Sequence, residues 1–211
     1  MDLFTYYRST SSYRVRIALA LKGLDCNAIP VNLVREGGEQ HQPRFRAVNP
    51  QGRVPALRLD GGQVLTQSCA IIEYLEERYP QPPLLGTDLV LRARQRAVAA
   101  LIGCDIHPLH NVSVLNRLRG LKHDEATVSD WITHWISEGL TAVEQLIDGH
   151  PFCFGESPSV ADVYLLPQLY AARRFNVDLA PYPRILRVQA SASDHPAFRI
   201  AHPDAQPDKP E

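Results

Sequence analysis

Residues 81–88 separate two parts of the chain that have different hydrophobic patterns. Before this segment, short strand and helix patterns alternate and are often interrupted by Gly and Pro. After it, residues 89–106 and 125–147 carry long amphipathic patterns at helical spacing. The segment itself is rich in Pro, Gly and Leu, which is typical of an interdomain linker. The sequence therefore predicts an α/β domain at 1–82 and an all-helical domain at 88–211.

The first domain is predicted to follow the order β-α-β-α-β-β-α. The expected strands are 2–7, 28–33, 54–59 and 63–65. The expected helices are one capped by Ser11 or Ser12, a short one over 44–48, and one that is capped by Ser68 and runs through Tyr79. Asp60-Gly61-Gly62 indicates the turn of a hairpin between the last two strands. Gly23 is expected to end the first helix, and Ile71, Ile72 and Leu75 to face the core from the last one.

The charge balance argues against a nucleic-acid partner or an anionic membrane surface, because 22 basic residues face 23 acidic ones. The N-terminus lacks a secretory leader pattern, and we expect no segment long enough to span a bilayer, so a cytoplasmic enzyme acting on small molecules is predicted. The cysteines are widely spaced and form no C-x-x-C pair, so we expect them to be reduced and buried. They are Cys26, Cys69, Cys104 and Cys153.

Four consecutive hydroxyl residues, Ser9 to Ser12, lie between the first strand and the first helix. A helix N-terminus favours negative charge, and a hydroxyl donating to a bound sulfur would stabilise its thiolate. The alternative is that these residues only cap the helix. Two other motifs also allow two interpretations each. Val54-Pro55 is either a cis peptide bond that turns the Val54 backbone toward a ligand or an ordinary edge proline. Gln67-Ser68 is either a site for a ligand carboxylate or a simple helix cap.

In the second domain, Ser159 and Asp162 have the spacing of a capping box. The last ten residues, 202–211, contain three prolines and are expected to pack loosely. A cluster with the composition of a metal site also occurs, comprising Cys104, Asp105, His107 and His110. Because Pro108 breaks the helical register and no distant ligand pair completes the set, we predict no metal.

Together these features resemble the glutathione transferase superfamily, and specifically its zeta class. The similar runs are 9–23, 49–57, 67–77, 105–111 and 174–179, and the likeness extends over essentially the full length. The resemblance implies a thioredoxin-like N-terminal domain, a helical C-terminal domain, a homodimer and glutathione as cofactor.

The resemblance also implies roles for individual residues. Ser9 would bond the glutathione sulfur, with Thr10 and Ser11 beside it. The tripeptide would be held by Gln40, Val54, Gln67 and Ser68. His107 and the stretch Asn111 to Ser113 would border the site from the helical domain, and Arg8 and Arg174 would bind substrate carboxylates.

The activity implied is a cis-trans isomerisation in which glutathione is not consumed. Similar enzymes act on maleylacetoacetate, and some bacterial relatives act on maleylpyruvate. General conjugating or peroxidase activity and glutathione binding without turnover are the alternatives. Many zeta enzymes have cysteine where this chain has Ser11, so chemistry that needs a second thiol is not expected.

Overall fold

The computed structural model describes residues 1–210, and packing divides them into two compact units. Unit 1 combines Met1–Pro83 with the segment that begins at His195, and unit 2 is Leu84–Asp194. The domain limits read from the sequence, 1–82 and 88–211, stay a prediction. By packing, however, the chain from His195 onward belongs with unit 1.

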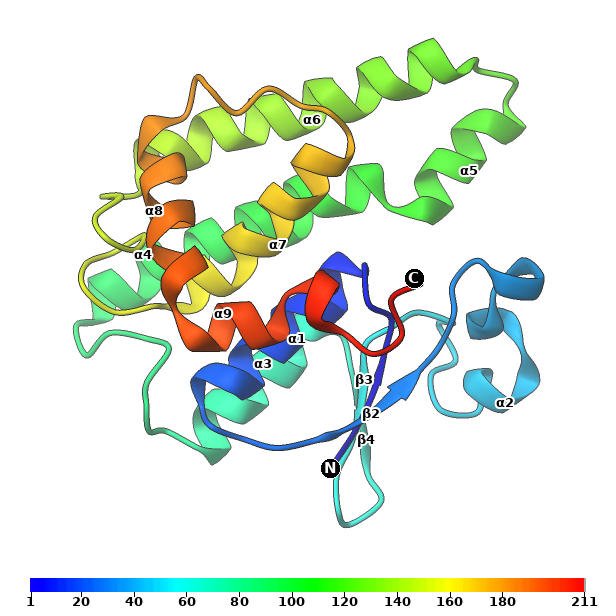
Figure 1. The fold of residues 1–211 in the computed structure, drawn as a ribbon, viewed down its shortest axis with the longest axis horizontal. Coiled ribbons are helices and arrows are strands. Elements are labelled where there is room, and N and C mark those ends of the chain that lie inside the picture. Colours follow the sequence, from blue (N-terminus) through cyan, green and yellow to red (C-terminus); the bar gives the residue numbers. More distant parts are fainter. Residues whose placement is uncertain (211) are drawn as a thin grey trace. The chain divides into compact units, whose positions relative to one another are not determined.

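Unit 1 is built on a four-stranded sheet of order β2-β1-β3-β4 (Figure 1). Its strands are β1 Asp2–Thr5, β2 Asn27–Pro30, β3 Ala56–Arg58 and β4 Val64–Thr66. Its first three helices are α1 Thr10–Leu21, α2 Pro43–Arg46 and α3 Ser68–Arg78, and two 3-10 turns, η1 Arg35–Gly37 and η2 Glu39–His41, precede α2. β1 is parallel to β2 and antiparallel to β3, and β3 is antiparallel to β4. The predicted order of elements is confirmed.

The caps of α1 and α3 differ from the sequence prediction. Ser9, not Ser11 or Ser12, is the N-cap of α1, because its Oγ accepts the Ser12 backbone N–H at 3.2 Å. Gln67 occupies the cap position of α3, so Ser68 is the first helical residue. Gly23 follows α1 with φ +63°, a conformation that suits glycine, as predicted.

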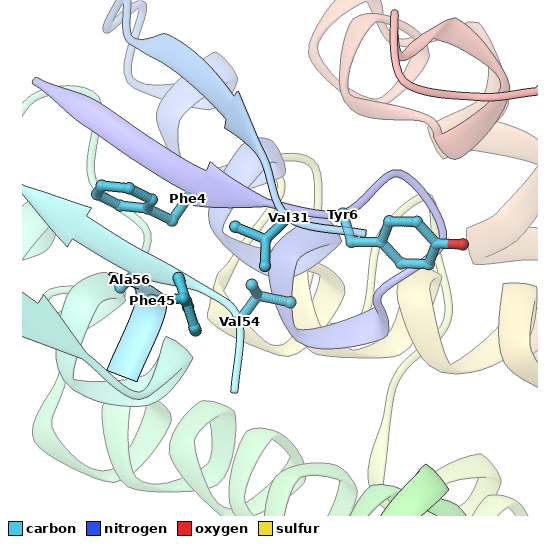
Figure 2. Packing of buried hydrophobic residues seen from close by; sticks show 6 residues of the cluster. All are labelled: Phe4, Tyr6, Val31, Phe45, Val54 and Ala56. Carbon is cyan, nitrogen blue, oxygen red and sulfur yellow. The ribbon is translucent and has the colours of Figure 1, made fainter. Parts of the chain in front are cut away.

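A cluster of apolar side chains fills the space between the sheet and α2 (Figure 2). Its buried members are Phe4, Tyr6, Val31, Phe45, Val54 and Ala56. Phe4 and Ala56 come from paired strands, and the ring of Phe45 lies 6.0 Å from that of Phe4. Ile71, Ile72 and Leu75 of α3 are also buried, as predicted.

Unit 2 is helical. Its elements are α4 Leu89–Ala100, the π turn η3 Leu101–Ile106, the 3-10 turn η4 His107–His110, α5 Val112–Gly120, α6 Glu125–Leu146, α7 Val160–Arg174 and α8 Pro183–Asp194. The helix expected over 89–106 is thus α-helical only to Ala100 and then widens into the π turn, a geometry that is frequent at functional sites. The capping box of α7 is confirmed, because the buried Asp162 carboxylate accepts both the N–H and the hydroxyl of Ser159 at 2.8 Å.

The C-terminal segment packs within unit 1. It contains α9 Pro196–Ala201, which lies along α1, and the 3-10 turn η5 Pro203–Ala205 (Figure 1). Pro203 is buried and Asp208 accepts a hydrogen bond from the Tyr7 backbone. The prediction of a loosely packed tail was therefore wrong for residues 202–210, while Glu211 lies outside the described residues.

Two further expectations need correction. One helical stretch, Leu89–Gly120, is long and apolar enough by composition to cross a membrane, although a single such helix is weak evidence because core helices meet the same test. All four cysteines are free, as predicted, but Cys69 and Cys104 are exposed. Cys153 is buried, and burial raises the pKa of its thiol well above the usual value.

Candidate active site

The register of the sheet in unit 1 gathers four chain segments at one edge. Thr5 of β1 lies opposite Pro30 of β2, and because these strands are parallel, both end at this edge. β3 runs the other way and therefore begins there, with Ala56 opposite Thr66 at the end of β4. The predicted site residues lie on the segments next to these strand ends. Ser9 follows β1, Gln40 follows β2 and Gln67 follows β4, while Val54 precedes β3.

Ser9 combines the two roles that the sequence left as alternatives. As N-cap of α1, its oxygen accepts the Ser12 N–H, but a hydroxyl has one donor hydrogen as well as two acceptor positions. The O–H of Ser9 can therefore still donate to a ligand. Ser9 is half-buried at the end of α1 where backbone N–H groups favour negative charge.

The neighbours of Ser9 differ in accessibility. Thr10 is buried, with 5% of its surface exposed, so it can reach a ligand through its backbone amide more readily than through its hydroxyl. Ser11 and Arg8 are partly exposed. The guanidinium carbon of Arg8 lies 5.8 Å from the centre of the Tyr6 ring, within cation–π range.

Gln40 provides a buried acceptor. Its amide nitrogen lies 3.1 Å from His41 Nε2, while its Oε1 accepts no hydrogen bond from any residue of the described chain. Buried polar atoms are nearly always satisfied, so this oxygen suits a donor group on a ligand. Gly38 makes room for the carboxamide, because a Cβ at that position would overlap it.

Val54 and Gln67 complete the edge. The Val54–Pro55 peptide bond is cis. Gln67 has φ +68°, which is uncommon for a residue other than glycine and occurs preferentially at functional sites. Its Nε2 donates to Gln51 Oε1 at 2.7 Å, and the buried Ser68 follows at the start of α3, where open N–H groups can receive a carboxylate.

In unit 2, ring contacts connect His107 with Arg174. The His107 ring lies 5.3 Å from that of His110, which lies 5.6 Å from Phe175. The guanidinium of Arg174 stacks over Phe175 at 4.6 Å. Two residues that the sequence placed far apart therefore belong to one continuous group within this unit.

The residue at the centre of this group was not predicted for such a role. His110 is buried and its Nε2 lies 3.1 Å from Oε1 of the fully buried Gln168. In the sequence, His110 is a candidate only for a metal ligand, and nothing in the pattern of α7 marks Gln168. Cys104 and Asp105 are exposed whereas His110 is buried, and within residues 1–210 no group of three or more His, Cys, Asp or Glu is arranged to hold a metal ion.

Asn111 and Ser113 lie together at the start of α5. The Asn111 carboxamide oxygen accepts the Ser113 N–H at 3.1 Å and its hydroxyl at 3.0 Å. This arrangement is an N-cap, so any ligand contact by these side chains must coexist with capping.

Comparison with known proteins agrees with this geometry. Two family models match, the glutathione S-transferase N-terminal domain over residues 3–83 and the C-terminal domain over residues 115–199. The maleylacetoacetate isomerase of Pseudomonas aeruginosa is 67% identical over 100% of this chain and 99% of its own length.

Two solved structures are also similar. A holo maleylpyruvate isomerase, described as a bacterial zeta-class glutathione S-transferase, is 48% identical, with a TM-score of 0.94 and full coverage of both chains. A maleylacetoacetate isomerase from Anaeromyxobacter dehalogenans with glutathione in its active site is 43% identical, covering 99% of this chain and 97% of that one at a TM-score of 0.89. The predicted fold class, a thioredoxin-like domain followed by a helical domain, is confirmed. The chain belongs to the glutathione S-transferase family and, within it, to the zeta class.

Proposed function

We propose that the protein is a glutathione-dependent isomerase that converts maleylacetoacetate to fumarylacetoacetate, a step of aromatic amino acid catabolism. The observation that carries this proposal is the 67% identity to a maleylacetoacetate isomerase. It is supported by the places of Ser9, Gln40 and Gln67 on segments that follow strands ending at one edge of the sheet. The holo maleylpyruvate isomerase is less similar, at 48% identity, so we propose maleylacetoacetate and not maleylpyruvate as the substrate.

The residues at the sheet edge fit glutathione as cofactor. The acceptor-only Oε1 of Gln40 suits an N–H of a peptide, and the start of α3 at Gln67 and Ser68 suits a carboxylate. Both groups occur in the tripeptide. The proposed binding set is Ser9, Thr10, Ser11, Gln40, Val54, Gln67 and Ser68, and the family resemblance adds His107, Asn111 and Ser113 to this proposal.

When bound, glutathione supplies a thiol for reversible addition to an activated cis double bond. The Ser9 hydroxyl would donate a hydrogen bond to that sulfur, and the N-terminus of α1 would favour the thiolate over the thiol. Arg8 and Arg174 would bind the carboxylates of the substrate, because a guanidinium grips a carboxylate at two points. The roles of both arginines are proposals.

Removing the Ser9 hydroxyl tests the central role. In Ser9→Ala we expect a raised pKa of the bound thiol and a lower kcat, measured by ultraviolet titration of thiolate and by isomerase assay. Because Ser9 is also an N-cap, the control is Asp124→Ala, which removes the cap of α6. Both changes should cost about 1 kcal/mol of stability, but only the first should alter the thiol. An unchanged thiol titration and kcat in Ser9→Ala would remove Ser9 from this role.

Substrate preference is decided by kcat/KM for maleylacetoacetate and maleylpyruvate at fixed glutathione. A higher value for maleylpyruvate would replace the proposed substrate. Rapid turnover of a chlorinated aromatic with poor isomerisation would instead favour a conjugating transferase.

The family resemblance also supports a cytoplasmic homodimer. Sedimentation of the purified protein tests the assembly, and a monomer at assay concentrations would contradict it.

A further inference from the structure

The C-terminal segment of unit 1 is tied to the loop that leads into α1. The backbone N–H of Tyr7 donates to Asp208 Oδ2 at 2.8 Å, although the two residues are 201 positions apart in sequence. A carboxylate that accepts a backbone N–H makes a charge-assisted hydrogen bond, which is stronger than a neutral one. Asp208 is only partly exposed, so solvent competes less for this bond than at an open surface.

Arg16 holds the other side of the same peptide segment. Its side chain extends from α1 and is buried, and its Nη2 donates to the Tyr7 carbonyl oxygen at 2.8 Å. Nη1 donates to the Tyr6 carbonyl oxygen at 3.3 Å. The planar guanidinium fixes the directions of these donors. The N–H and the C=O of Tyr7 are therefore both held, one by Asp208 and the other by Arg16.

The same arginine fastens the C-terminal segment. Arg16 Nε donates to the carbonyl oxygen of Ala201, the last residue of α9, at 3.0 Å. Beyond α9, the His202 ring meets the Tyr13 ring edge-on at 5.8 Å, and Lys209 pairs with Asp204 at 2.6 Å. These contacts give the segment a fixed path that brings Asp208 to Tyr7.

Ser9 is the residue whose position depends on this arrangement. It is two residues beyond Tyr7, and its N–H donates to the Tyr6 carbonyl oxygen at 3.0 Å, so Tyr6 to Ser9 form one turn. A shift of the Tyr7 peptide would change the direction in which the Ser9 hydroxyl points.

We propose that Asp208 is a positioning residue for the isomerase, which fixes the Tyr7–Ser9 turn through the Tyr7 N–H and so orients the Ser9 hydroxyl toward the bound sulfur. The inference rests on the proposed function for its effect on catalysis. Its structural part, the immobilisation of the turn by the C-terminal segment, is testable without any reaction.

The experiment compares Asp208→Ala, Asp208→Asn and the control Asp25→Ala, which removes an exposed carboxylate of the same unit. Asparagine keeps an oxygen that can accept the Tyr7 N–H, so it should restore most of the function. In Asp208→Ala we expect kcat to fall about tenfold, equivalent to about 1.4 kcal/mol, and the bound thiol to ionise at higher pH. Asp208→Asn and Asp25→Ala should stay near the wild-type values, and circular dichroism verifies that each variant is folded.

Amide hydrogen exchange at Tyr7 in the ligand-free protein separates this inference from the proposed function. The Tyr7 amide should exchange faster in Asp208→Ala than in wild type or in Asp25→Ala. The exchange rates in the helices of unit 2 should be the same in all three proteins. If wild-type protein fails to bind glutathione in calorimetry, the proposed function falls, and the exchange rate alone then decides whether the turn is held. Unchanged exchange at Tyr7, or unchanged kcat and thiol titration in an active Asp208→Ala enzyme, overturns the inference.

Discussion

The ammonium of Lys22, at the C-terminal end of α1, lies 2.7 Å from a carboxylate oxygen of Glu76 in α3. The Lys22 side chain is fully buried, and its Nζ also donates to the carbonyl oxygens of Tyr79 at 2.7 Å and Pro82 at 3.1 Å. One cation thus joins the ends of two helices of unit 1 and the segment that follows them.

Removing the carboxylate of this pair should destabilise unit 1 strongly. Glu76→Gln leaves the buried Lys22 ammonium without its counter-charge, and such a loss costs about 3–5 kcal/mol. Chemical denaturation measures it. The control is Asp148→Asn, which breaks an exposed ion pair with Arg94 and should change stability little. Equal losses for the two variants would show that burial does not strengthen the Lys22–Glu76 pair.

Gly38 should be required for glutathione binding because of the space it leaves for Gln40. A Cβ at Gly38 would overlap the Gln40 carboxamide, whereas at Gly37 it would meet nothing within 4 Å. Both glycines have positive φ, +101° and +78°, so alanine at either position is strained. We expect Gly38→Ala to raise the KM for glutathione about tenfold, as for the loss of one hydrogen bond.

Gly37→Ala is the control for that change, because it also places alanine at a position of positive φ but without the overlap. Its KM for glutathione should remain near that of wild type. A similar rise in both variants would attribute the effect to the backbone and not to the carboxamide of Gln40.

A second glycine, Gly139 of unit 2, should be sensitive to substitution because it lies against the π turn η3. A Cβ at Gly139 of α6 would overlap the buried Ile106 side chain at the end of the turn. Alanine is the better helix former, but overpacking a filled core costs about 1–3 kcal/mol and should outweigh that gain. We expect Gly139→Ala to lower the melting temperature. Gly120→Ala, in a helix with open space around the added methyl group, should leave it unchanged or raise it slightly.

Stability should also depend on pH through an ion pair at the start of α6. Hydrogen bonds from Arg119 hold the pKa of the Glu125 carboxyl below its usual value. A lowered folded-state pKa gives a contribution that is present above the unfolded pKa and is lost as pH falls through the folded value. The melting temperature of wild type should therefore exceed that of Glu125→Gln near neutral pH, and the difference should disappear in acid. A difference that persists in acid would exclude this ionisation as the cause.

Local patterns predicted the elements of this fold because each depends on neighbouring residues. The hairpin at Asp60-Gly61-Gly62 and the capping box of Ser159 and Asp162 are examples, since the chemistry that forms them lies within a few positions. The true cap of α1 was missed because several adjacent hydroxyls could serve, and only the path of the chain from β1 selects Ser9.

Features that depend on distant contacts could not be predicted. The C-terminal segment looks unstructured by composition, yet Arg16 and Asp208 fasten it to the first loop across nearly the whole sequence. The positive φ of Gln67 likewise leaves no mark in the pattern of side chains. Motif likeness identified the candidate site residues, but their supporting contacts became visible only in three dimensions.

The hydrogen bond between His110 and Gln168 leads to a prediction about the substrate. Both side chains are buried, and the His110 ring lies between His107 and Phe175, over which Arg174 stacks. Gln168→Leu removes a buried hydrogen-bond partner of His110, which should cost about 1–3 kcal/mol of stability. Because the ring would then lose its fixed orientation, we expect Phe175 and Arg174 to shift and the KM for the unsaturated diacid to rise.

The matched control is Gln189→Leu, which removes a surface carboxamide that accepts a hydrogen bond from Arg173 at 2.7 Å in the same unit. Steady-state kinetics of both variants, with denaturation curves to compare stability, distinguish the two cases. A loss of stability in Gln168→Leu with an unchanged KM for the diacid would limit the His110–Gln168 pair to folding. A raised KM in Gln168→Leu but not in Gln189→Leu would show that the His110–Gln168 pair positions Arg174. The pair would act through Phe175, because the His110 ring contacts Phe175 and the Arg174 guanidinium stacks on it.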